Sequence, residues 1–134
     1  MKLAALTLAA TLVALPAMAQ KVPLNQNQHI TDSLVAGRVA DVIRNTCSSI
    51  SGRLVTAYSK LEDLKQYGIA QGYTEAEVKA FLKDGNEKAR LKGIAADYLA
   101  QAGAVEGDEE SYCTVGRAEI AKGTLAGSLL RSWK

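Results

Sequence analysis

The side chains of this chain with the greatest capacity for metal binding or nucleophilic catalysis are two cysteines and one histidine, Cys47, Cys113 and His29. A structural zinc site needs more cysteine or histidine ligands than these, and c-type haem attachment needs a Cys-x-x-Cys-His motif. A catalytic triad or Cys-His pair needs a histidine beside its nucleophile, whereas His29 stands alone ahead of the first predicted helix. We therefore predict no catalytic, metal-binding or cofactor-binding residue, and a protein that is not an enzyme.

The densest group of carboxylates, Glu106-Gly107-Asp108-Glu109-Glu110, has two interpretations. Clustered acidic side chains can bind calcium, but the Asp-x-Asp-x-Asp-Gly spacing of a calcium loop is absent. Acidic residues are also favourable in the first turn of a helix, where they face the positive end of the helix dipole. We favour this second interpretation and predict that a helix begins here. The glycines show neither of the common phosphate-binding patterns.

The N-terminus has the three parts of a secretory signal peptide. Lys2 is followed by an apolar run from Leu3 to Leu15, then by Pro16, and Ala17-Met18-Ala19 offers a small-x-small cleavage site before Gln20. The run is shorter than the roughly 20 apolar residues that span a bilayer, which argues against the alternative of a retained membrane helix. The sequence predicts cleavage between Ala19 and Gln20 and a mature periplasmic protein without a transmembrane segment.

The two cysteines are predicted to form a disulfide. An exported chain with an even number of cysteines favours pairing, and Cys47 and Cys113 allow only one connectivity. Cys47 lies on the apolar stripe of the first long predicted helix and Cys113 on that of a late one, so the bond would tie the two ends of the domain together. Gly116, one turn from Cys113, would let these helices approach closely. The alternative is two separate buried thiols.

Composition and patterning predict one small helical domain. The formal net charge of only +2 gives no support to nucleic-acid binding. We expect a signal peptide at residues 1–19, a flexible polar leader at 20–29 and a single all-α domain at 30–134, with about four to six helices closed by one disulfide. No segment shows convincing two-residue alternation, so no strand is predicted.

Apolar residues at three- and four-residue spacing indicate where the helices run. The first stripe contains Ile43, Cys47, Ile50, Leu54, Ala57, Leu61 and Leu64, with a cap expected at Thr31 or Asp32 and a break at residues 48–52. Gly68 or Gly72 should end that region. Further caps are predicted at Thr74, as a capping box with Glu77, and at Asn86, with stops at Gly103 and Gly123.

The C-terminal tail, 124–134, is predicted to be a helix capped by Thr124. Leu125, Leu129 and Trp133 recur every four residues and would form one apolar strip, with Leu130 widening it and Arg131 beside it. Two accounts of the strip stay open. It packs on the core of its own domain, or it is a contact surface for a partner protein or a membrane.

Several segments carry a family resemblance. The stretches 44–53 and 110–120, with Gly72-Tyr73 and Glu87-Lys88-Ala89-Arg90 between them, make the chain similar to a domain family of unknown function found as small exported proteins of alphaproteobacteria. Its members are often encoded beside subunits of the respiratory NADH:quinone oxidoreductase, and some carry a name borrowed from the E subunit. That name does not transfer, because an E-type subunit holds an iron–sulfur cluster on four cysteines.

These observations favour a non-enzymatic periplasmic interaction protein, and the resemblance implies a role accessory to a membrane respiratory complex. The alternative is a small periplasmic ligand-binding or client-binding module that resembles a chaperone. An unrecognised hydrolase ranks third. The sequence identifies no specific partner, and it predicts no cofactor.

Overall fold

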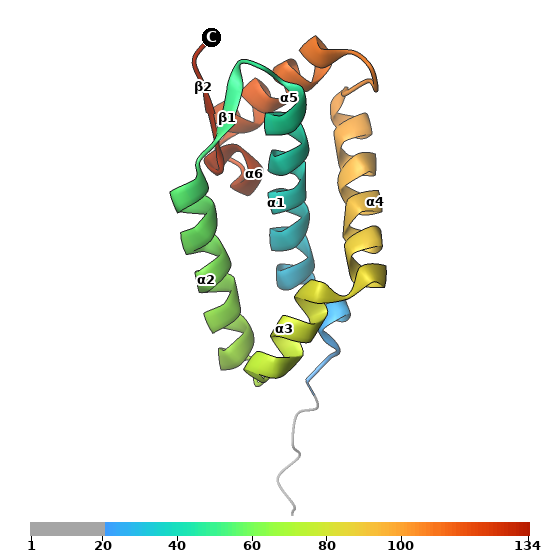
Figure 1. Ribbon diagram of the computed structural model, residues 1–134, viewed down its shortest axis with the longest axis vertical. Coiled ribbons are helices and arrows are strands. Elements are labelled where there is room, and N and C mark those ends of the chain that lie inside the picture. The colour runs from blue at the N-terminus through green and yellow to red at the C-terminus, as the bar shows by residue number, and fades with distance from the viewer. Residues whose placement is uncertain (1–20) are drawn as a thin grey trace, which may run out of the picture.

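The computed structural model describes residues 21–134 (Figure 1). In this part of the chain the elements, in order, are a 3₁₀ turn η1 (Leu24–Gln26), α1 (Gln28–Thr46), β1 (Ile50–Gly52), α2 (Leu54–Ala70), α3 (Glu75–Lys83), α4 (Gly85–Ala102), α5 (Glu109–Lys122), α6 (Leu125–Ser128) and β2 (Leu130–Ser132). The prediction of a mostly helical fold closed by a disulfide between Cys47 and Cys113 is confirmed. The predicted signal cleavage site, Ala19 and Gln20, lies outside the described residues.

Helix α1 begins earlier than the sequence indicated. Its N-cap is Asn27, whose side chain accepts a hydrogen bond from the backbone N–H of Ile30 at 3.1 Å, and neither Thr31 nor Asp32 caps it. The segment predicted to be a flexible leader therefore contributes the first turn of a helix. The start of the predicted leader also contacts the domain, since the Tyr73 hydroxyl donates to the carbonyl oxygen of Val22 at 2.6 Å.

A small antiparallel sheet was missed by the sequence analysis. It joins β1 and β2, with Ile50 opposite Ser132 and Gly52 opposite Leu130. β1 occupies the predicted break between the first two helices, so that the single apolar stripe of the sequence is divided between α1 and α2. Each strand has three residues, too few to show alternation, and the pairing partners are far apart in the sequence.

The core forms around α1, which packs against α4 on one side and against α5 and α6 on another (Figure 1). Its fully buried centre includes Val39 and Ile43, joined by Ala95 and Leu99 of α4 and Val115 of α5. Helix α5 approaches α1 closely at Gly116, as predicted. A methyl group at Gly116 would lie 2.7 Å from a methyl carbon of Ile43, closer than carbon atoms pack, so only glycine fits.

Local sequence signals set most of the other helix ends. Thr74 and Glu77 form the predicted capping box at α3, and Gly103 and Gly123 end α4 and α5 with left-handed backbone. The acidic cluster begins α5 as predicted, with Asp108 as the N-cap. Helix α4 differs: Asp84, two residues before the predicted Asn86, is its N-cap and accepts from the Glu87 N–H at 2.9 Å.

Candidate binding groove

Helix α2 stands apart from the core and exposes apolar side chains. Gly68 is its one buried residue. Near the N-terminal end of the helix, Leu54 is 67% exposed, Val55 86% and Tyr58 67%. Of the apolar stripe predicted from the sequence, Leu54 and Leu61 are therefore open to solvent. Adjacent exposed apolar side chains on one helix are typical of an interaction surface.

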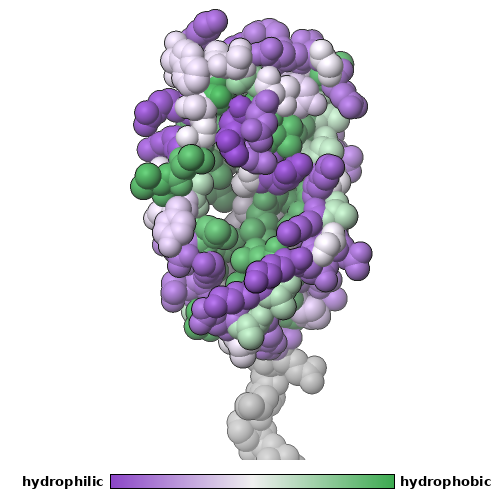
Figure 2. Space-filling view, viewed as in Figure 1, coloured by the Kyte–Doolittle hydropathy of each residue, from purple (hydrophilic) through white to green (hydrophobic). Residues whose placement is uncertain are grey.

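A groove of about 620 Å³ separates α2 from α1. Its apolar lining consists of Leu34, Ala40, Leu54, Ala57, Leu61, Leu64, Leu125 and Leu129. On the α1 side the lining includes the small residues Ser33 and Gly37, and a methyl group at Gly37 would meet no atom within 4 Å outside its own turn. Figure 2 shows apolar surface in the hollow between the two helices and over the upper end of α2, bordered by hydrophilic side chains.

The charged residues along the groove carry more positive than negative charge. Arg38 and Arg44 both contact the carboxylate of Asp41, at 3.2 and 2.7 Å. Arg53 donates to the neutral carbonyl oxygen of Ser128 at 3.2 Å. Lys60 also lines the groove, opposed only by Asp63 on its own helix. The border thus has four cationic side chains and two carboxylates, so it carries a net positive charge.

Both ends of α2 are fixed, which keeps the groove open between them. At one end the rings of His29 and Tyr67 lie 4.3 Å apart, and Gly68 packs beside Val78. At the other end the N–H of Arg53 donates to the carbonyl oxygen of Leu129 at 2.7 Å, directly after β1. His29 is exposed, but its contact with Tyr67 shows that it is not isolated and that it contributes to holding this end of α2.

The predicted C-terminal strip does not form, because α6 ends at Ser128 and the chain continues as β2. Leu129 and Leu130 are 7% and 3% exposed and belong to the core. Leu125 is 37% exposed and lines the groove, Arg131 is exposed on β2, and Trp133 is 59% exposed beyond it. The prediction of one continuous helical strip was therefore wrong. The five residues lie in the core, in the groove lining or on the exposed surface.

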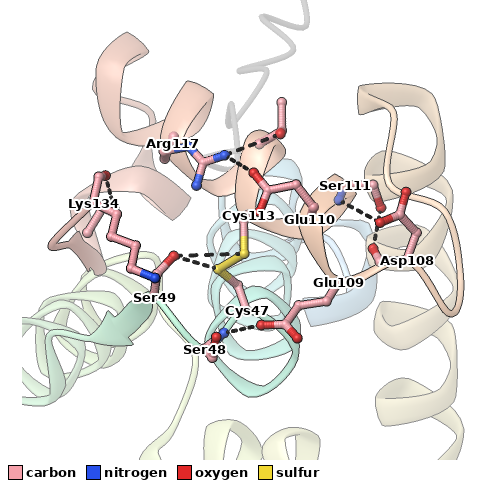
Figure 3. The surroundings of a disulfide bond; sticks show 12 residues. Cys47, Ser48, Ser49, Asp108, Glu109, Glu110, Ser111, Cys113, Arg117 and Lys134 are labelled. Carbon is pink, nitrogen blue, oxygen red and sulfur yellow. Dashed lines mark hydrogen bonds and ion pairs between the residues drawn. A yellow bond between two sulfur atoms is a disulfide. The ribbon is translucent and has the colours of Figure 1, made fainter.

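The disulfide lies between the end of α1 and the first turns of α5 (Figure 3). Cys47 and Cys113 are 1% and 3% exposed, and the Ser49 hydroxyl lies 3.3 Å from the Cys47 sulfur. Beside them the Glu109 carboxylate accepts from the Ser48 N–H at 2.8 Å, and the hydrogen bonds from Ser48 hold the pKa of Glu109 below its usual value. The bond is consistent with an oxidising location outside the cytoplasm.

One buried carboxylate, that of Glu119, joins three helices. It is 2% exposed and accepts hydrogen bonds from the Tyr98 hydroxyl of α4, at 2.7 Å, and from the Thr124 hydroxyl at the start of α6. The hydrogen bond to Glu119 raises the pKa of Tyr98. Both partners donate to the carboxylate, an arrangement that satisfies a buried acceptor and holds the helices together.

In residues 21–134 no three His, Cys, Asp or Glu side chains converge as metal ligands.

Sequence comparison places the chain in a family. None of the described helices combines the length and apolar composition needed to cross a membrane. No curated protein and no solved structure matches the chain. The model of one protein family covers residues 22–131, and so includes the core, the disulfide and both walls of the groove. The chain belongs to DUF5333, a family of unknown function.

Proposed function

We propose that this chain is a non-enzymatic interaction protein of the periplasm, and that the groove between α1 and α2 receives an apolar segment of a partner protein. The observation that carries the proposal is the exposure of Leu54, Val55 and Tyr58 at the edge of an apolar groove. Leaving the aliphatic side chains of Leu54 and Val55 in water costs up to roughly 1.5–3 kcal/mol each relative to full burial. A partner that covered them would recover that free energy.

The polar side chains of the groove support binding rather than catalysis. Asp41 is held between two guanidinium groups, and Arg53 donates to a backbone carbonyl. The ring of His29 packs at a tilt against that of Tyr67 at the end of the groove. A general acid or base needs a titratable group within hydrogen-bond reach of a nucleophile or substrate, and these side chains are instead used to position one another.

Two findings support a location in the periplasm. The disulfide favours an oxidising compartment, and the N-terminal sequence has the pattern of a cleavable signal peptide. The association with a membrane respiratory complex rests on the family resemblance alone. We retain it as a prediction about which envelope proteins to test first.

A second candidate function is binding of a small apolar ligand or of unfolded client chains. It is favoured by the size of the groove, since about 620 Å³ falls within the range of roughly 300–1,000 Å³ that is usual for small-molecule sites. The open side of the groove and the exposed residues next to it favour a polypeptide instead, because a small ligand inside the groove would leave Val55 and Tyr58 uncovered.

Site-directed photo-crosslinking in intact envelopes tests the proposal. A photoreactive phenylalanine analogue at Leu61, in the groove, should give a discrete crosslinked protein, whereas the same analogue at exposed Ala96 of α4 should not. Adding Gly37→Leu should abolish the crosslink by filling the groove, while Gly93→Leu on α4 should leave it unchanged. Crosslinks that ignore both substitutions would contradict the proposal. A bound small molecule seen by native mass spectrometry would favour the second function.

A further inference from the structure

The walls of the groove are helical, and this limits what can occupy it. Residues that line it on α1 run from His29 to Arg44, and those on the α2 side run from its N-cap, Arg53, to Leu64. At 1.5 Å per residue these walls are about 16–22 Å long, or three to four helical turns. Beyond the first turn of α2, the N–H and C=O groups of both helical walls are used inside their own helices, and strand β1 reaches the lining only at Gly52, so an extended occupant would find almost no main-chain partners along the groove.

An extended peptide would therefore leave its own backbone groups unpaired in an apolar trough, at a cost of roughly 1–3 kcal/mol for each unsatisfied group. A helix satisfies those groups internally and presents only side chains. The small residues Ser33, Gly37 and Ala57 on the two walls leave room for the larger apolar side chains of such a helix.

The charges along the groove indicate the flanks of the occupant. Lys60 and Arg53 have no carboxylate within ion-pair distance among the described residues, and Arg38 and Arg44 share one. A second copy of this chain would bring two basic borders together, an unfavourable arrangement. Acidic side chains on the occupant would instead face Lys60 and Arg53.

Building on the proposed function, we propose that the groove binds an amphipathic helix of a partner protein, three to four turns long, with an apolar stripe and acidic flanks. The stripe packs on Leu34, Leu61 and Leu64, and the acidic flanks lie along the basic border. The exposed side chains Val55 and Tyr58 extend the contact beyond the groove.

Two labelled helical peptides test the charge and shape of the occupant. Both carry leucine at positions i, i+4, i+7 and i+11, and their flanking residues are either all glutamate or all lysine. Fluorescence anisotropy with the mature protein should give a Kd at least tenfold lower for the glutamate peptide. Gly37→Leu should weaken its binding at least tenfold, while Gly93→Leu, at the matched open glycine of α4, should have no effect.

A charge reversal supplies the second arm. Lys60→Glu should reduce the preference for the glutamate peptide at least threefold, and Lys122→Glu, at an exposed position at the end of α5 outside the groove lining, should not change it. The inference would be overturned by equal affinity for the two peptides or by the absence of saturable peptide binding. Binding of dodecanoate but of neither peptide, or a dimer that Gly37→Leu dissociates, would also overturn it. If groove crosslinking in envelopes persists in those cases, the proposed function stands and only the helical, acidic occupant is lost.

Discussion

Replacing both Cys47 and Cys113 by alanine should lower the free energy of unfolding by about 4 kcal/mol. The two residues are 66 positions apart, and loop closure over that length removes about 14–15 cal/mol/K of entropy from the unfolded chain, or roughly 4 kcal/mol at 25 °C. For a domain of this size such a loss corresponds to a fall in Tm of about 15 °C. The double variant is preferable to either single one, because a single substitution leaves a reactive thiol.

Urea unfolding followed by circular dichroism at 222 nm measures this effect. The midpoint should fall, and the slope of free energy against urea should rise, because an unfolded chain without the crosslink exposes more surface. Ser49→Ala is the matched control. It removes the hydroxyl that lies 3.3 Å from the Cys47 sulfur but keeps the bond, and should cost no more than about 1 kcal/mol.

A loss below about 1 kcal/mol in the double variant would refute the loop-closure reasoning. It would mean that residual structure already restricts the unfolded chain, or that the bond strains the native fold. An unchanged slope would point to the same conclusion, because it would show that the unfolded ensemble is equally compact with and without the crosslink.

Three further predictions concern the C-terminal segment and the start of α5. Gly127→Ala should lower the free energy of unfolding, measured in urea, by about 1–3 kcal/mol or more. The added methyl group would lie 2.0 Å from the main-chain oxygen of Glu119 in α5. Leu130→Ala should cost about 2–5 kcal/mol, whereas Trp133→Ala, at a 59% exposed site, should stay within about 0.5 kcal/mol; equal losses would contradict the burial of β2. The lowered pKa of Glu109 stabilises the fold at pH values above the ordinary glutamate pKa of about 4.3, and this stability is lost as the pH falls through the lower folded pKa. Glu109→Gln should therefore flatten the acid limb of a stability–pH curve. An unchanged acid limb would show that the hydrogen bond to Ser48 does not contribute.

The parts of this fold that the sequence predicted are those set by local chemistry. The capping box at Thr74 and the left-handed glycines Gly103 and Gly123 act within one turn of the residues they stabilise. A short sequence window contains everything that such a signal needs. The disulfide was also predictable, because two cysteines allow only one pairing.

The parts that were missed depend on residues far apart in the chain. Leu130 and Trp133 have helical spacing, yet the chain forms a strand there because β1 offers a partner at Ile50–Gly52. The leucine stripe of α2 was recognised, but periodicity shows only that one face is apolar and not what covers it. The groove depends on how far α2 lies from α1, and no local pattern determines that distance.

The bond between Cys47 and Cys113 turns the main chain from β1 to the start of α5 into a macrocycle. One wall of the groove, α2, belongs to this closed circuit, whereas the other, α1, precedes it. A protease that cuts once within exposed α2 would therefore release no fragment, and the two pieces would separate only after reduction. The same closure keeps the cut wall covalently attached to the domain at both of its new ends.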